Sequence, residues 1–186
     1  ARWLLDAAGD GAVDGGTTER EGADWQLRQR VADTYDLSRV GGYLYLFGWA
    51  VVGWLAGAWT IEPMATLAAG AIFLLLGYLR WAARPPRLAG DAALRRWLRR
   101  YSLLLPTSSL AWAGVQSWIL LDPRFGNDVR MVSLVATIGY ATVFANVYST
   151  VRRVAATGVL VLFLPVLVLL WADAGQRALA VAMSFY

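Results

Sequence analysis

Five side chains inside long apolar stretches could bind a small molecule. Gln116 and Asn146 offer amide donors and acceptors, and Trp112, Tyr140 and Phe144 offer aromatic faces. Polar groups placed in lipid usually face the interior of a helix bundle, and they often mark function. These five residues therefore predict a pocket for a small hydrophobic ligand. Helix packing and helix–helix hydrogen bonds are the more frequent explanation of such residues.

The residues needed for catalysis are missing from the sequence. The chain has no cysteine and no histidine, which excludes thiolate chemistry and removes the commonest general base and metal ligand. Four carboxylates come from three separate loops without metal-ligand spacing: Glu62, Asp122, Asp128 and Asp173. We therefore predict no catalytic residue, no metal and no cofactor in these residues, and any enzyme activity would lie in a domain beyond Tyr186.

The candidate ligand residues lie in apolar runs long enough to cross a bilayer, which takes about 20 residues in a helix. The runs lack the period-two alternation of a membrane β-barrel. They cover residues 41–60, 64–83, 101–121, 131–150 and 155–171, and a sixth run begins near residue 178 and stops at 186. The sequence thus predicts an all-α integral membrane bundle of six transmembrane helices, with the sixth incomplete. Because the chain starts at Ala1 rather than Met and stops inside this run, we expect further polypeptide.

The basic residues predict the orientation of these helices. All 17 are arginines, and only Arg124, Arg130 and Arg177 lie on one side of the predicted membrane. Arginine and lysine are enriched on the cytoplasmic side of membrane proteins. We therefore expect the N-terminus and the C-terminus in the cytoplasm. The basic composition is explained by a lipid bilayer as partner and does not require nucleic acid.

Two amphipathic segments flank the spans. Residues 24–39 place Leu27, Val31 and Tyr35 on one helical face, and residues 91–100 surround an apolar face with arginines. Both predict helices that lie at the membrane interface, with docking to a partner as the alternative. Residues 1–22 are rich in Gly, Asp and Thr, which is typical of a flexible segment. We therefore divide the chain into a cytoplasmic segment, 1–40, and a transmembrane domain, 41–186. The arginines expected at lipid headgroups are Arg95, Arg96, Arg99, Arg100, Arg152 and Arg153.

Small residues predict close helix packing. Gly53 and Gly57 form a GxxxG pattern, and Gly70 and Gly77 lie seven residues apart on one face. Missing side chains let two helices approach closely in lipid, either within one chain or in a homodimer. The deeper tryptophans are expected to face other helices, because their N–H groups need partners: Trp49, Trp54 and Trp112.

One stretch resembles a known class of membrane region. The stretch that begins at residue 95 contains RRWLRRYSLLLPTSSLAWAGVQSWILLDP, then VSLVATIGYATVFANVYST after a short outer loop, then VLVLFLPVLVLLW after a basic turn. This order resembles the multi-span N-terminal sensor region of bacterial histidine kinases and diguanylate cyclases. The resemblance implies a sensor in the bacterial inner membrane that passes a signal through its last helix to a cytoplasmic output domain.

Two other functions fit the same sequence. A non-catalytic structural or assembly subunit of a larger membrane complex would use the glycine faces and the amphipathic segments as its interfaces. A small membrane carrier would show inverted repeats, which we do not find convincingly in the sequence. The sequence contains neither a kinase histidine nor a GGDEF motif, either of which would identify a signalling output domain.

Overall fold

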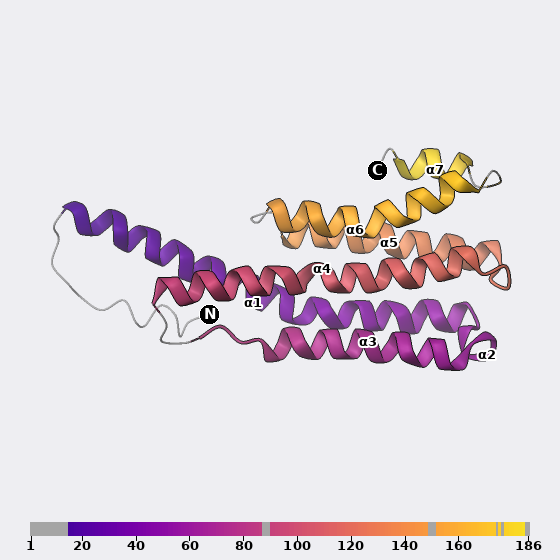
Figure 1. Cartoon of the computed structure of the whole chain (residues 1–186), viewed down its shortest axis with the longest axis horizontal. Coiled ribbons are helices and arrows are strands. Elements are labelled where there is room, and N and C mark those ends of the chain that lie inside the picture. Colours follow the sequence, from indigo (N-terminus) through magenta and orange to yellow (C-terminus); the bar gives the residue numbers. More distant parts are fainter. Residues whose placement is uncertain (1–14, 87–89, 149–151, 174, 176, 185–186) are drawn as a thin grey trace.

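The computed structural model describes residues 15–86, 90–148, 152–173, 175 and 177–184, and the side chains of residues 15–24, 178, 179 and 182 are outside this description. All regular secondary structure in these ranges is helical (Figure 1), which confirms the all-α prediction for the described chain. The helices are α1 (Gly15–Leu55), α2 (Ala58–Ile61), α3 (Pro63–Ala82), α4 (Asp91–Leu121), α5 (Asn127–Val147), α6 (Arg152–Ala172) and α7 (Arg177–Ser184).

Three helices of the described chain are long and apolar enough to cross a membrane. They are α3, α5 and α6. Large apolar side chains stay exposed on the outside of the bundle, including Leu74 on α3, Val135 on α5 and Leu160 on α6. A water-soluble protein rarely leaves so much apolar surface uncovered, whereas lipid tails cover it without cost. The chain therefore has the character of a membrane protein.

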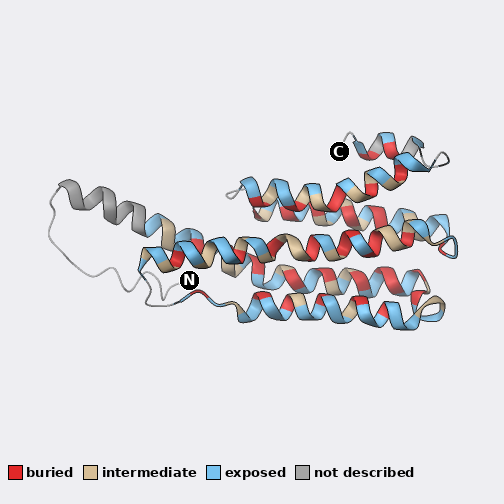
Figure 2. Ribbon diagram, in the orientation of Figure 1, coloured by how far each residue is buried: buried red, intermediate tan, exposed pale blue. Residues whose placement is uncertain are grey.

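The helices pack side by side around α1 and α4. Helix α3 contacts α1, α2 and α4, while α5 contacts α1, α4 and α6, and α7 lies on α6. The buried residues face inward between these helices, and the exposed residues cover the outside (Figure 2). The N-terminal part of α1 extends beyond the end of the bundle (Figure 1). Helices α3 and α5 thus both contact α1 but do not contact each other.

Two segments predicted as separate helices are continuous with the following apolar run. The helix expected over residues 24–39 is part of α1, and the helix expected over 91–100 is part of α4. In α1 the glycine pair at 41–42 does not end the helix, and its missing side chains leave room for α3. The predicted flexible segment, 1–22, overlaps α1 from Gly15 onward, and residues 1–14 are outside the described chain.

The predicted glycines occupy different kinds of position. Gly77 meets α1 at Gly42, where a Cβ added to Gly42 would lie 2.7 Å from the Gly77 Cα. Gly70 faces the Trp49 ring, and Gly53 has only that same ring near it. Gly57 follows α1 with φ 60°, a left-handed conformation that favours glycine, so it serves the turn into α2.

The three tryptophans expected to lie deep in the membrane also occupy different kinds of position. Trp49 and Trp112 are buried between helices as expected, but Trp54 is 80% exposed and faces outward. The Trp49 indole N–H donates a hydrogen bond to the Thr66 carbonyl of α3, 3.1 Å away. The six arginines expected at headgroups are all exposed, a position that suits lipid contact but does not test it: Arg95, Arg96, Arg99, Arg100, Arg152 and Arg153.

Candidate functional site

The structure places the five predicted ligand residues in three different environments. Trp112 and Gln116 are fully buried between α4 and α5. Tyr140 and Phe144 line a cavity between α1 and α5. Asn146 is exposed on another face of α5, where it lines a separate groove shared with α6 and α7. A single pocket that includes all five residues is therefore wrong.

Trp112 and Gln116 belong to a hydrogen-bonded network between two helices. The Trp112 indole N–H donates to the Thr137 hydroxyl at 2.9 Å. The Gln116 amide donates to the Ser133 hydroxyl at 3.0 Å, and its oxygen lies 3.2 Å from the Thr137 hydroxyl. All four residues are buried, so these bonds meet the polar requirements of their side chains. For these two residues, helix–helix hydrogen bonding is the better explanation.

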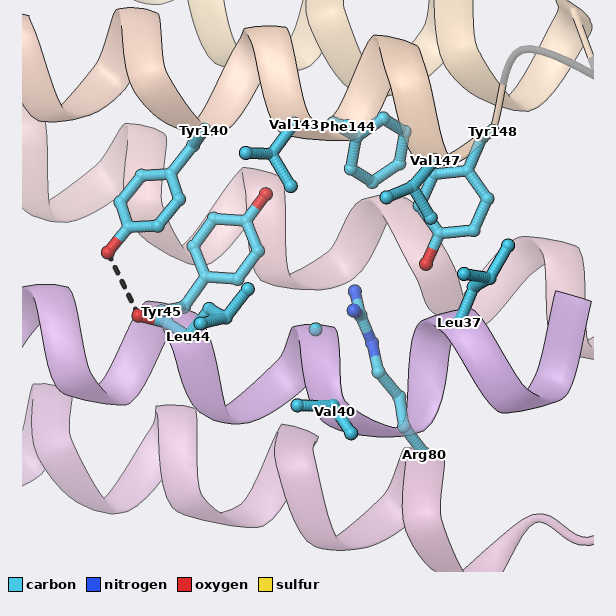
Figure 3. Close-up of a pocket in the computed structure, with 11 residues that line it drawn as sticks. Leu37, Val40, Leu44, Tyr45, Arg80, Tyr140, Val143, Phe144, Val147 and Tyr148 are labelled. Atoms are coloured by element: carbon cyan, nitrogen blue, oxygen red, sulfur yellow. Dashed lines mark hydrogen bonds between the residues drawn. The ribbon is translucent and has the colours of Figure 1, made fainter.

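The cavity beside Tyr140 and Phe144 has a volume of about 140 Å³ (Figure 3). Its walls come from α1 and α5, with one residue from α3. Several wall residues are half exposed on the outer face of the bundle, among them Val40 and Val143, so the cavity opens sideways onto the apolar exterior. The lining residues are Leu37, Val40, Gly41, Leu44, Tyr45, Arg80, Tyr140, Val143, Phe144, Val147 and Tyr148.

Arg80 is the candidate site residue that sequence reasoning missed. It lies in the last turn of α3 and its side chain is only 1% exposed. One guanidinium nitrogen, Nη2, donates a hydrogen bond to the Leu105 carbonyl of α4. The Nε–H is buried and has no hydrogen-bond partner, and no carboxylate in the described chain forms an ion pair with this arginine. A buried cation without a counter-charge is costly in an apolar environment.

Helix α1 makes room for this side chain. Arg80 starts on α3, which has no helix contact with α5, and its guanidinium reaches the cavity that α1 and α5 line (Figure 3). It passes α1 at a glycine pair. A Cβ added to Gly42 would lie 3.2 Å from the Arg80 Cδ, and one on Gly41 would lie 3.8 Å from Nη1. Larger residues at 41 and 42 would narrow or close the path.

Aromatic side chains from two neighbouring helices fix the end of α3 that carries Arg80. The last carbonyls of a helix lack partners within the helix. Here the Tyr35 hydroxyl donates to the Trp81 carbonyl at 2.8 Å, and the Trp97 indole donates to the Ala83 carbonyl at 3.2 Å. The Tyr101 hydroxyl lies 3.5 Å from the Arg80 carbonyl. These contacts hold the backbone of Arg80 in place, so its side chain projects in a defined direction.

Tyr140 joins the two walls of the cavity. Its hydroxyl on α5 donates to the Leu44 carbonyl on α1 at 3.0 Å. The contact depends on Gly48, because a Cβ there would lie 1.4 Å from the same hydroxyl oxygen. The Tyr140 ring also stacks on Tyr45, with centroids 4.5 Å apart. The α1–α5 distance beside the cavity is therefore set by one hydrogen bond and one ring contact.

The sequence did contain a signal for Arg80. Its position near the end of an apolar run suggests an arginine of the cytoplasmic loop. However, the buried residues of α3 are spaced by three and four and end on this arginine: Thr66, Ala69, Phe73, Gly77 and Arg80. Residues at this spacing share one helical face. The arginine therefore continues the face of α3 that packs inward, and the sequence alone shows this spacing.

An arginine that projects into an apolar cavity can bind an anion through charge and through its N–H groups. The cavity could thus hold a small molecule with an apolar body and an acidic group. Comparison with known proteins adds no assignment, because no protein-family model, curated protein or solved structure matches this chain.

Proposed function

We propose that this chain is the membrane-embedded input module of a signalling protein, and that the cavity between α1 and α5 binds its signal molecule. The observation that carries the proposal is a cavity with apolar walls, open to the side, in which a buried arginine lacks a counter-charge. Ionisable residues inside a membrane protein are expensive and usually functional. Structural packing alone does not require a charged group at this place.

The proposed topology has six crossings, with both termini in the cytoplasm of a bacterial cell and the helices in its inner membrane. Helices α3, α5 and α6 supply three of them. The C-terminal part of α1 and most of α4 run alongside these helices and also expose apolar side chains, such as Phe47 and Leu110. Helix α7 would begin the sixth crossing. The excess of arginine on one side of this arrangement supports the orientation.

The resemblance implies that the signal leaves through the last helix, but the cavity lies against α1, so we propose instead that the signal passes through α1. This helix is continuous over 41 residues, from the wall of the cavity to the segment beyond the bundle. A ligand in the cavity changes the contact between α1 and α5, and it favours whichever arrangement of the two helices binds it better. Gln29 lies about 16 Å along the helix from Val40, at a rise of 1.5 Å per residue. A small tilt at the cavity therefore produces a larger displacement at the end of α1.

A side chain that fills the cavity can test this coupling without a ligand. Val143→Trp places an indole in the cavity, whereas Val135→Trp places one on the 64%-exposed outer face of the same helix. Because the chain has no cysteine, spin labels can be attached at Gln29→Cys on α1 and Ala145→Cys on α5. Their separation is then measured by electron–electron double resonance in lipid nanodiscs.

We expect Val143→Trp to shift the label distance by about 2 Å or more, since helix shifts of this order accompany signalling transitions. Val135→Trp is expected to leave the distance unchanged. An unchanged distance in both variants would show that filling the cavity does not move α1, and the proposed input function would then be wrong.

A further inference from the structure

The charge of Arg80 limits the chemistry of the ligand. The described chain provides one hydrogen bond to its guanidinium, from Nη2 to the Leu105 carbonyl, and leaves the buried Nε–H without a partner. The guanidinium is a planar fork of N–H donors that matches a carboxylate or a phosphate group. An anion would meet both needs of this side chain, because it supplies hydrogen-bond acceptors and a counter-charge.

The role of Arg80 as a structural cap does not explain its charge. A carbonyl such as that of Leu105 can accept a hydrogen bond from a neutral donor, for example a serine or threonine hydroxyl. The chain instead uses an arginine and leaves room for it at Gly42, where a Cβ would lie 3.2 Å from the Arg80 Cδ. An arginine that is only 1% exposed also gives up its hydration. These features fit a binding group better than a cap.

The remaining walls determine the rest of the ligand. Beyond the guanidinium, the tyrosine rings and the Phe144 ring, the walls that α1 and α5 present are aliphatic. They continue to the outer face of the bundle, where Leu37, Val40 and Val143 are about half exposed. An aliphatic wall that is open to lipid suits an alkyl chain whose far end remains in the bilayer. The opening also gives such a molecule a way in from the membrane.

We propose that the cavity binds a single-chain amphiphile with a carboxylate or phosphate headgroup, which enters sideways from the bilayer. Its anionic head pairs with the Arg80 guanidinium, and its alkyl chain lies along Leu37, Val40 and Val143. This proposal rests on the proposed function in one respect, namely that the cavity is a ligand site. It adds the charge and the shape of the ligand and the route by which the ligand arrives.

The test compares two probes that differ in charge. The full chain is placed in phosphatidylcholine nanodiscs, and binding of radiolabelled dodecanoate and dodecanol is measured at equal amounts in the membrane, at a pH where the acid is ionised. We expect dodecanoate to bind about tenfold or more tightly than dodecanol, as a charge-assisted hydrogen bond implies. Equal binding of the two probes by the wild-type chain would overturn the proposal, and this comparison needs no variant.

Matched variants locate the effect. Arg80→Gln is expected to abolish the preference for dodecanoate. Arg84→Gln removes the same charge from an exposed arginine just beyond α3, where Arg84 lies over the Trp81 ring, and it is expected to preserve the preference. A preference that survives Arg80→Gln would overturn the proposal. If this variant does not fold, the comparison of probes on the wild-type chain still decides.

Further arms separate the possible failures. Acetate and inorganic phosphate lack an alkyl chain, and we expect neither to compete with dodecanoate at millimolar concentration. Competition by either would show that the ligand is a free anion from solution.

Val143→Trp is expected to reduce binding of both dodecanoate and dodecanol. If it reduces both while the two bind equally, the cavity remains a ligand site and only the anionic head is wrong. If it changes neither, the cavity is not the site and the proposed function fails with it.

Discussion

The two ends of the bundle treat an arginine in opposite ways. At one end Arg124 is exposed and holds two carboxylates, with Nη2 2.7 Å from Asp122 and 2.9 Å from Glu62. At the other end Arg80 is buried, and no carboxylate in the described ranges pairs with it. At the exposed end, where water can already solvate the charge, the arginine has carboxylate partners. At the buried end, where an unpaired charge is costly, the described chain supplies no carboxylate partner.

This difference between Arg124 and Arg80 indicates which of the two arginines has a role other than stabilising the fold. An exposed ion pair contributes little to stability, so the Arg124 cluster is explained by orientation of the loops around it. A buried charge without a partner lowers stability, so it persists only where something else depends on it. The described chain contains carboxylates, but none of them forms an ion pair with Arg80. We infer that its counter-charge comes from outside the protein.

The largest effect is expected from filling the space that Gly48 leaves for the Tyr140 hydroxyl beside the cavity. Gly48→Ala would place a Cβ 1.4 Å from the Tyr140 hydroxyl, so the ring must move and its hydrogen bond to Leu44 is lost. Overpacking of this kind costs about 1–3 kcal/mol of the free energy of unfolding. The loss is measured by thermal unfolding of the protein in a non-ionic detergent.

The control for this variant is Gly114→Ala, because a Cβ added to Gly114 on α4 meets nothing within 4 Å. It is expected to be neutral or stabilising by up to about 1 kcal/mol, since alanine is the better helix former. If Gly48→Ala unfolds at the same temperature as the wild type, Tyr140 does not fix the distance between α1 and α5.

The next effect has the opposite sign. Arg80→Met removes the unpaired charge and keeps an apolar chain in the cavity wall, so we expect the empty protein to become more stable by about 1 kcal/mol or more. Arg124→Met at the other end removes an exposed group and is expected to give no increase. The two variants are compared in the same unfolding experiment. Strong destabilisation by Arg80→Met would make this arginine a structural cap.

A smaller effect is expected in the polar network, which separates packing from binding. Gln116→Leu breaks the contacts to Ser133 and Thr137 and should cost about 1 kcal/mol, the size found for hydrogen bonds between membrane helices. Because Gln116 does not line the cavity, its replacement should leave dodecanoate binding unchanged. If Gln116→Leu loses dodecanoate binding while its stability is unchanged, Gln116 belongs to the ligand site.

The smallest effect concerns the exposed end and depends on pH. Hydrogen bonds from Arg124 lower the pKa of Asp122 from 3.8 to about 2. A lowered pKa means that the pairing stabilises the fold above pH 3.8, and that this contribution is lost as the pH falls from 3.8 toward 2. Arg124→Gln should return the pKa of Asp122 toward 3.8, as followed by carboxyl resonances in an NMR titration. An unchanged pKa would show that Arg124 does not hold this carboxylate in solution.

The sequence predicted the helices well and the site only in part. Apolar runs of sufficient length predict helices by themselves, so α3, α5 and α6 agree with the predicted spans to within a few residues. Whether an arginine near the end of a run points outward or inward depends on which neighbour leaves room for it. For Arg80 that room comes from Gly41 and Gly42 on another helix, which a single-helix reading does not connect with it.

The same limit explains the divided fate of the predicted ligand residues. Trp112 and Tyr140 are in ring contact, at 4.6 Å between centroids, yet one belongs to a hydrogen-bonded helix contact and the other to a cavity wall. Asn146 follows Tyr140 by six residues, and a helix turns it to another face. The residue types predicted that these side chains make specific contacts. Their partners on other helices determine whether each contact is a helix–helix hydrogen bond or part of a cavity wall.

The sideways opening of the cavity changes what this site would measure. A pocket that faces water responds to the concentration of a dissolved molecule. A pocket whose walls continue into the bilayer responds to the number of amphiphiles per lipid, whatever the volume of the surrounding medium. Diluting the cells would leave its occupancy unchanged, whereas a change in lipid synthesis or breakdown would alter it at once. Such a site reports the composition of the membrane.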